Sequence, residues 1–308
     1  MEQQIFEANL NEIKYKMMKT LESIILGFDG IIFGGYVRDT YIHNHYAQKF
    51  YENSENIKYS NPENDLDTKN RLLVAKDIDV FLKGNNIQTL YDKFTASGFH
   101  VISKETKTMY FDNKEIFQQK SDIRLNNMNL YGMPNVTVSL DVLYTTNDTI
   151  EPCFGKLDLM CNCLIMYKNG IRLSTQTGTE LDNTISYTRK MLEMEILNDI
   201  LQLKTDIAKS LEERSIKDRK LQFLRAFNMQ LKGWKINNCI YEVKTELNKL
   251  VCDLCDQLLS KKYVHLNCCG CKVHTQCFEK DVCSEYKDEN KPHCPNTKCD
   301  VWEKKWLF

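Results

Sequence analysis

Cysteine is distributed very unevenly along this chain, and its distribution constrains the fold more than any other feature. The chain has 13 cysteines in 308 residues: nine at 252, 255, 268, 269, 271, 277, 283, 294 and 299, and the others at 153, 161, 163 and 239. The start MEQQIFEANL has no basic segment followed by an apolar one, so we expect an intracellular, reducing compartment, the cytoplasm. There, a separate cysteine-rich module indicates metal thiolates rather than disulfides.

The spacing of these cysteines is typical of zinc ligands. A pair such as Cys252 and Cys255 lets one turn supply two of the four ligands that tetrahedral Zn²⁺ needs. So short a segment cannot bury enough apolar surface to fold alone, so metal binding would contribute the folding free energy. We predict two structural zinc ions with eight ligands: Cys252, Cys255, Cys269, Cys271, His274, Cys277, Cys294 and Cys299.

The order of these ligands resembles the RING finger and its variants. The segment from Cys269 to His274 stands where that family has Cys-Gly-His-x-Phe-His. The resemblance implies a cross-brace of two zinc sites, the first with Cys252, Cys255, His274 and Cys277, the second with Cys269 (or Cys268), Cys271, Cys294 and Cys299.

The partner of this RING-like module stays open. Leu254 matches the apolar position through which ubiquitin-ligase RINGs contact a ubiquitin-conjugating enzyme, and Pro295 matches the usual Cys-Pro. Against ligase activity, four residues instead of two separate Cys294 from Cys299, and Asp300 replaces a basic residue of many active RINGs. A ubiquitin ligase and a zinc module that docks protein or RNA are the two interpretations.

The residues before the cysteine-rich segment predict a mixed α+β fold. A stripe of apolar residues predicts a helix over 2–26, and short β-branched runs predict strands at 30–33, 77–82, 99–103 and 136–144. Helical patterns dominate from 184 to 250. We therefore expect a mixed-sheet domain over 1–170 with a surface insertion at about 50–70, a helical body over 171–248, and the zinc module over 249–308.

Composition excludes two classes of protein. The apolar runs are far shorter than the roughly 18 residues that cross a bilayer, so no membrane partner is expected. A net charge of -1 excludes a uniformly basic nucleic-acid coat, so any anion site must be local.

Three aspartates form the candidate catalytic group. Asp77 and Asp79 are two residues apart on a predicted strand and therefore point to the same face. Asp141 interrupts an otherwise apolar strand and faces away from the core. Three carboxylates on neighbouring strands can hold two Mg²⁺ ions that activate a hydroxyl and neutralise a transferring phosphoryl group.

A glycine pair lies upstream of these acids. Gly34 and Gly35 end a strand, and their missing Cβ atoms let backbone N–H groups approach a phosphate chain. Arg38 and Asp39 follow one turn into the next helix.

Together these segments resemble the DNA polymerase beta-like nucleotidyltransferase superfamily, in its CCA-adding enzyme and poly(A) polymerase branch. The resemblance lies in the run from Phe33 to Asp39, in Asp77-Ile78-Asp79, and in 158–162 followed by the turn at 168–170. It implies that Asp77, Asp79 and Asp141 are the catalytic, Mg²⁺-binding acids, that Gly34 and Gly35 hold the triphosphate, and that Arg38, Asp39, Asp158 and Asn162 bind the nucleotide.

The chain departs from that branch at three places. More residues than usual separate Asp39 from Asp77, as the predicted insertion requires. Lys156-Leu157 replaces an arginine pair, and Arg219 and Gln222 replace the acid and arginine that read the incoming base. CCA addition is therefore not specifically predicted.

The expected function is template-independent addition of nucleotides from a nucleoside triphosphate to an RNA 3′ end. The alternatives are a RING-type E3 ubiquitin ligase on a non-catalytic nucleotidyltransferase-like platform, and a catalytically inactive RNA-binding protein. The RING-like module is expected to dock protein or RNA, and a ubiquitin-conjugating enzyme or another protein is its candidate partner.

Overall fold

The computed structural model divides the chain into two compact units. Unit 1 comprises Met1–Cys153 and Asn162–Thr175, and unit 2 comprises Phe154–Cys161 and Gln176–Phe308. Within them, the structure describes residues 2–53, 77–83, 86–111, 114–125, 136–145, 159–173, 186–207, 216–237, 239, 241–245, 252–255, 257, 259 and 262–280.

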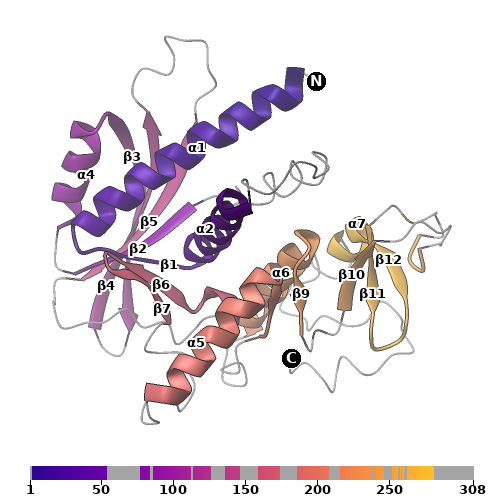
Figure 1. The fold of residues 1–308 in the computed structure, drawn as a ribbon. Coiled ribbons are helices and arrows are strands. Elements are labelled where there is room, and N and C mark those ends of the chain that lie inside the picture. The colour runs from indigo at the N-terminus through magenta and orange to yellow at the C-terminus, as the bar shows by residue number, and fades with distance from the viewer. Residues whose placement is uncertain are drawn as a thin grey trace. The chain divides into compact units, whose positions relative to one another are not determined.

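Unit 1 contains a mixed seven-stranded sheet in the order β3-β4-β5-β2-β1-β6-β7 (Figure 1). β2 and β5 pair in parallel, and the other neighbours pair antiparallel. The strands are β1 (Ile31–Phe33), β2 (Asp77–Lys83), β3 (Phe99–Phe111), β4 (Lys114–Leu125), β5 (Thr137–Thr145), β6 (Leu164–Tyr167) and β7 (Gly170–Leu173).

The central strands of this sheet have one apolar face. Ile78 and Val80 of β2 and Val138, Leu140 and Val142 of β5 are at most 1% exposed. The helices of unit 1 are α1 (Glu2–Gly27), α2 (Gly35–Asn53) and α4 (Ile87–Ala96), and Figure 1 shows α1 and α4 packed beside the sheet. The alternation of β5 leaves Thr137, Ser139 and Asp141 on the opposite, polar face.

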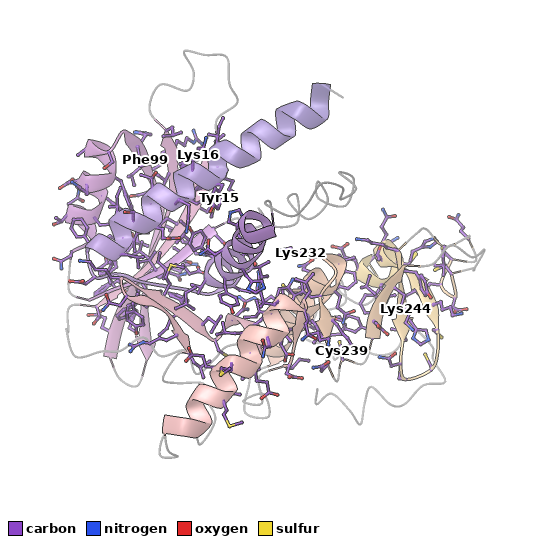
Figure 2. The ribbon with its side chains drawn as sticks, viewed as in Figure 1. Tyr15, Lys16, Phe99, Lys232, Cys239 and Lys244 are labelled. Atoms are coloured by element: carbon purple, nitrogen blue, oxygen red, sulfur yellow. The ribbon has the colours of Figure 1, made fainter. Side chains whose placement is uncertain are left out.

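A polar contact joins α1 to α2. The Tyr36 hydroxyl donates to Glu22 Oε2 at 2.6 Å, and the Tyr15 ring, labelled in Figure 2, lies 4.5 Å from the His43 ring. Burial first, and then Glu22, raise the pKa of Tyr36 far above its usual value, so this hydroxyl stays protonated and remains a donor.

Unit 2 joins helices to small sheets. Its helices are α5 (Ser186–Leu201), α6 (Ile216–Leu231) and the short α7 (Thr275–Phe278), with a 3₁₀ turn at Met160–Asn162 that begins in this unit. β8 (Lys204–Thr205) pairs in parallel with β9 (Lys235–Ile236). β10 (Tyr241–Thr245), β11 (Lys262–Leu266) and β12 (Lys272–His274) form an antiparallel sheet.

An aromatic cluster forms the core between α6 and this antiparallel sheet. The Phe278 ring lies 5.1 Å from Tyr241, 5.3 Å from Phe227 and 5.7 Å from Phe223. Phe278 and Tyr241 are fully buried. The helical segment and the cysteine-rich segment therefore share one hydrophobic core.

The mixed α+β class is confirmed. The strand predicted at 99–103 is the start of β3, which continues to Phe111 and forms a long hairpin with β4. The region where helical patterns dominate, 184–250, contains α5 and α6 and also β8, β9 and β10. β10 is a strand because it pairs with β11, which no local pattern reveals.

Of the insertion expected at about 50–70, residues 50–53 belong to α2 and the rest lie outside the described residues. No helix in the described part of the chain combines the length and apolarity needed to span a membrane.

Candidate active site and metal centre

Strand register brings the three predicted catalytic aspartates onto one face of the sheet in unit 1. In the parallel pair, Asp79 of β2 lies directly opposite Asp141 of β5, and Asp77 lies opposite Ser139. Residues paired in this way point to the same side, as do residues two apart on a strand. Asp77 is exposed, whereas Asp79 and Asp141 are half-buried. The result is an acidic row on the polar face.

Gly34 lies directly against this row. It has φ of +76°, a conformation that side chains rarely adopt, and it follows Phe33, which pairs with Asp79. A Cβ at position 34 would come 2.8 Å from Asp79 Oδ2. The backbone conformation therefore favours glycine here, and any larger residue would also displace the Asp79 carboxylate. The glycine pair and the Asp-x-Asp motif, 40 residues and more apart in sequence, meet at one point.

Arg38 donates hydrogen bonds to two of the other predicted site residues. Its Nε donates to Asp39 Oδ1 at 2.7 Å, and its Nη1 donates to Asn162 Oδ1 at 3.0 Å. Arg38 is 6% exposed, and a Cβ on Gly35 would lie 3.4 Å from its Nη2. A paired, buried guanidinium of this kind fixes the start of α2 relative to the segment at Asn162.

Asp141 has one carboxylate oxygen that is hydrogen-bonded and one that is not. Gln118 Nε2 of β4 donates to its Oδ2 at 2.6 Å, but its Oδ1 is buried without a hydrogen-bond partner. Burial raises the pKa of Asp141 and Asp77 adds to the rise, while Gln118 and Lys120 oppose it. A bound cation would give Oδ1 the partner that it lacks.

One predicted residue is not described by the structure, and one residue of the site was not predicted. Asp158 lies outside the described residues. Gln118, which the sequence did not single out, holds the third acid through its hydrogen bond. Its strand, β4, comes beside Asp141 only through pairing with β5, which no local pattern reveals.

The metal centre in unit 2 consists of three cysteines and one histidine. The ligand atoms of Cys252, Cys255, His274 and Cys277 all lie within 4.8 Å of one another. His274 Nδ1 is 3.4 Å from Cys255 Sγ and 3.8 Å from Cys277 Sγ. Three thiols and an imidazole in this spacing suit tetrahedral Zn²⁺, so the cluster could hold a zinc ion. The predicted first ligand set is thus brought together.

Local structure presents these ligands in pairs. Cys252 and Cys255 flank a turn, and His274 ends β12 just before Cys277 in α7. Burial raises the pKa of Cys252, but hydrogen bonds from the backbone N–H groups of His274, Leu254 and Cys255 lower it by more. The net result is a pKa of about 7, below the usual value of 9.0. A thiol with this pKa is readily available as the thiolate that binds metal.

In contrast to Cys252, Cys277 has a raised pKa when no metal ion is bound. Burial, followed by its hydrogen bond with Cys255, raises its pKa to about 12. Crowded thiols cannot all ionise without a cation among them, so zinc binding and loss of protons are coupled in this cluster.

The second predicted zinc site is only partly within the described residues. Cys269 and Cys271 lie between β11 and β12, and both are half-buried. Cys294 and Cys299 lie outside the described residues. Gly270, between the first two, has φ of +76° and nothing near its Cβ position, as a turn requires.

Among the described residues, the three aspartates do not form a cluster as tight as that of the cysteines and histidine. Comparisons of the chain with protein-family models and with curated proteins find no match.

Proposed function

We propose that the chain is a metal-dependent nucleotidyltransferase of the DNA polymerase beta-like type that adds nucleotides to an RNA 3′ end without a template. The observation that carries this proposal is the pairing of Asp79 with Asp141 on adjacent parallel strands, directly beside Gly34. In nucleotidyl transfer, carboxylates bind the metal ions, and a glycine lets the phosphate chain approach the backbone. In this chain the two kinds of residue lie side by side.

The acidic row fits Mg²⁺. Carboxylate oxygens are the ligands this ion prefers, and it usually keeps several waters and takes one or two carboxylates from the protein. The three aspartates therefore do not need to lie as close together as the four ligands of a zinc site do. Asp141 Oδ1, buried and unpartnered, and the exposed Asp77 are the groups that such an ion would satisfy. When bound, Mg²⁺ lowers the pKa of an attacking hydroxyl and neutralises charge on the phosphoryl group.

The protein's own residues would prepare the reactants. The backbone at Gly34 and Gly35, at the start of α2, can approach a triphosphate because no Cβ intervenes. Arg38 fixes Asn162 in place, and Gln118 fixes Asp141. Catalysis would then rest mainly on positioning and electrostatic stabilisation, as is usual for phosphoryl transfer.

A primer-extension assay with purified protein, Mg²⁺, each nucleoside triphosphate and short labelled RNAs tests the proposal. We expect extension by the wild type and a loss of at least about 10²-fold in Asp77→Ala/Asp79→Ala. The sequence contains one more Asp-x-Asp, Asp65-Leu66-Asp67, in the predicted insertion, and Asp65→Ala/Asp67→Ala is a matched control that should retain activity. Absence of extension, or equal extension by both double variants, would refute the proposal.

Ubiquitin transfer is the second candidate, and one observation favours it. Cys252, Cys255, His274 and Cys277 converge as the first site of a RING-like cross-brace would, with Leu254 half-buried between the first two. Autoubiquitination with an activating enzyme and a panel of conjugating enzymes tests it, with Leu254→Ala as the comparison. If no conjugating enzyme supports transfer, the module serves protein or RNA docking instead.

A further inference from the structure

Three buried side-chain atoms in the described part of the chain have no hydrogen-bond partner: His43 Nδ1, Arg124 Nε and Asp141 Oδ1. Burying an unpartnered polar atom costs free energy, so each needs a reason. His43 lies on α2, against Tyr15 of α1. Arg124 and Asp141 lie on neighbouring strands, β4 and β5, and have opposite charges.

Strand register places these last two on the same face. Lys120 pairs with Asp141 and Arg124 pairs with Thr137, and directly paired residues point to the same face. Arg124 is four residues from Lys120 on β4, so it points to the same face as Lys120 and Asp141. Four residues of strand correspond to about 13 Å. A cation that partners the Asp141 carboxylate cannot also partner the cationic Arg124, so a ligand that satisfies both must extend along the face and carry negative charge near Arg124.

Asp122 lies between Arg124 and Asp141 on this face, and its negative charge is already neutralised by another residue. Asp122, one step from Arg124 on this face, forms an ion pair with Lys104 at 2.7 Å and accepts a hydrogen bond from Ser139 at 3.2 Å. A bulge in β3 beside Ser103 lets Lys104 reach this face. Asp122 is therefore already partnered by Lys104 and Ser139, and the Nε of Arg124 is buried without a hydrogen-bond partner within the described residues.

The side chains next to Arg124 suit an anion. Its two cross-strand neighbours are His100 on β3 and Thr137 on β5, neither of which carries a negative charge at neutral pH. A guanidinium presents a planar fork of donors that matches a phosphate group. The acidic row would repel a polyanion, so an acceptor strand that enters the site needs a cationic contact beyond it.

We propose that Arg124 binds a backbone phosphate of the acceptor RNA, upstream of the 3′ end that the acidic row receives. The acceptor would then run along the polar face of β4 and β5, from Asp141 towards Arg124. This inference rests on the proposed function for the identity of its ligand. It assigns Arg124 to binding, and no step of the reaction involves it.

Binding of a fluorescently labelled single-stranded RNA in Mg²⁺, without nucleotide, tests the assignment independently of turnover. Arg124→Gln should weaken binding about tenfold, equivalent to about 1.4 kcal/mol, and should reduce the slope of log affinity against log salt by about one. Lys93→Gln is the charge-matched control: Lys93 is exposed on α4, whose Tyr91 packs on the other face through Ser121, and both quantities should stay at the wild-type value.

Two further variants keep the result interpretable. Arg124→Lys keeps the charge, so the salt slope should stay at the wild-type value while affinity falls, because an ammonium cannot replace the fork. The unfolding midpoint of each variant confirms that it folds. Removing a buried, unpartnered group should leave that midpoint unchanged or raise it.

The outcomes separate this inference from the proposed function. Wild-type affinity and salt slope in Arg124→Gln would overturn the assignment even if the enzyme extends RNA. Weaker binding in Arg124→Gln with no extension by the wild type would support the RNA contact and reject the transferase. Displacement of RNA by inorganic phosphate at equal ionic strength would assign the site to a free phosphate and overturn the acceptor-strand contact.

Discussion

At the scale of single residues, Gly34 and Asp79 show how tightly the candidate site is specified. The glycine is favoured by its positive φ, and a Cβ at this position would also meet a carboxylate oxygen of Asp79. The oxygen belongs to a side chain that can rotate, so a substitution there should move the carboxylate more than it disrupts the backbone.

Gly34→Ala and Gly98→Ala form a matched pair that tests this. Gly98 has φ of +88° and nothing within 4 Å of its Cβ position. The left-handed backbone should cost each variant about 1–2 kcal/mol, which lowers the unfolding midpoint by about 2–4 °C per kcal/mol. Only Gly34→Ala should also lose RNA extension, because Asp79 is displaced. Equal activity in the two variants would argue against a role for this contact.

Asp141 gives a pH-dependent prediction. Its pKa lies above the usual 3.8, with burial the main cause, so the folded state binds the proton more tightly than the unfolded state does. Ionisation therefore removes stability as the pH rises through this range. Asp141→Asn should raise the unfolding midpoint at pH 7, and the gain should disappear as the pH falls below 3.8. A lower midpoint for Asp141→Asn at pH 7, measured calorimetrically beside the wild type, would contradict it.

At the scale of elements, α6 completes the edge of the small sheet in unit 2. Gln230 is 5% exposed; its Nε2 donates to the Tyr241 carbonyl at 3.1 Å, and its Oε1 accepts from the Val243 N–H at 2.7 Å. Its amide thus takes the place of a further strand beside β10. The Tyr241 hydroxyl returns a hydrogen bond to the Phe223 carbonyl of α6 at 3.0 Å.

Gln230→Met should destabilise unit 2. The substitution keeps the length of the side chain but leaves the carbonyl of Tyr241 and the N–H of Val243 without partners, at about 1–3 kcal/mol for each group that stays buried. Asn228→Met changes an exposed residue of the same helix and should have little effect. Denaturant unfolding compares the two, and similar midpoints would mean that the amide is not needed at this edge.

At the scale of the whole molecule, the Cys252, Cys255, His274 and Cys277 cluster adjoins the core of unit 2. Phe278 follows the ligand Cys277 directly and is fully buried among aromatic residues of α6 and β10. Metal binding should therefore order the helical segment as well as the cysteine-rich one. Unit 1 has its own sheet and core, so it should not depend on the metal.

Removal of zinc tests this division. Chelation, or His274→Ala, should remove a zinc ion and increase hydrogen exchange in β10, β11 and β12, while β1, β2 and β5 stay protected. His265→Ala is the matched control, since His265 lies on β11 outside the cluster and should keep its zinc. Metal content and peptide-level exchange are the measurements. Unchanged hydrogen exchange in β10 after zinc loss would show that the core of unit 2 does not depend on the metal.

The sequence by itself determined the features whose cause is local. Ligand spacing predicted the cysteine and histidine cluster, short β-branched runs predicted β2 and β5, and a two-residue spacing placed Asp77 and Asp79 on one face. Only the tertiary structure decided which distant groups meet. Strand pairing set Asp141 beside Asp79, joined β10 to β11, and put Gln118 and Arg124 on the face of the acidic row. Such pairing depends on contacts between segments far apart in the chain, which no local pattern encodes.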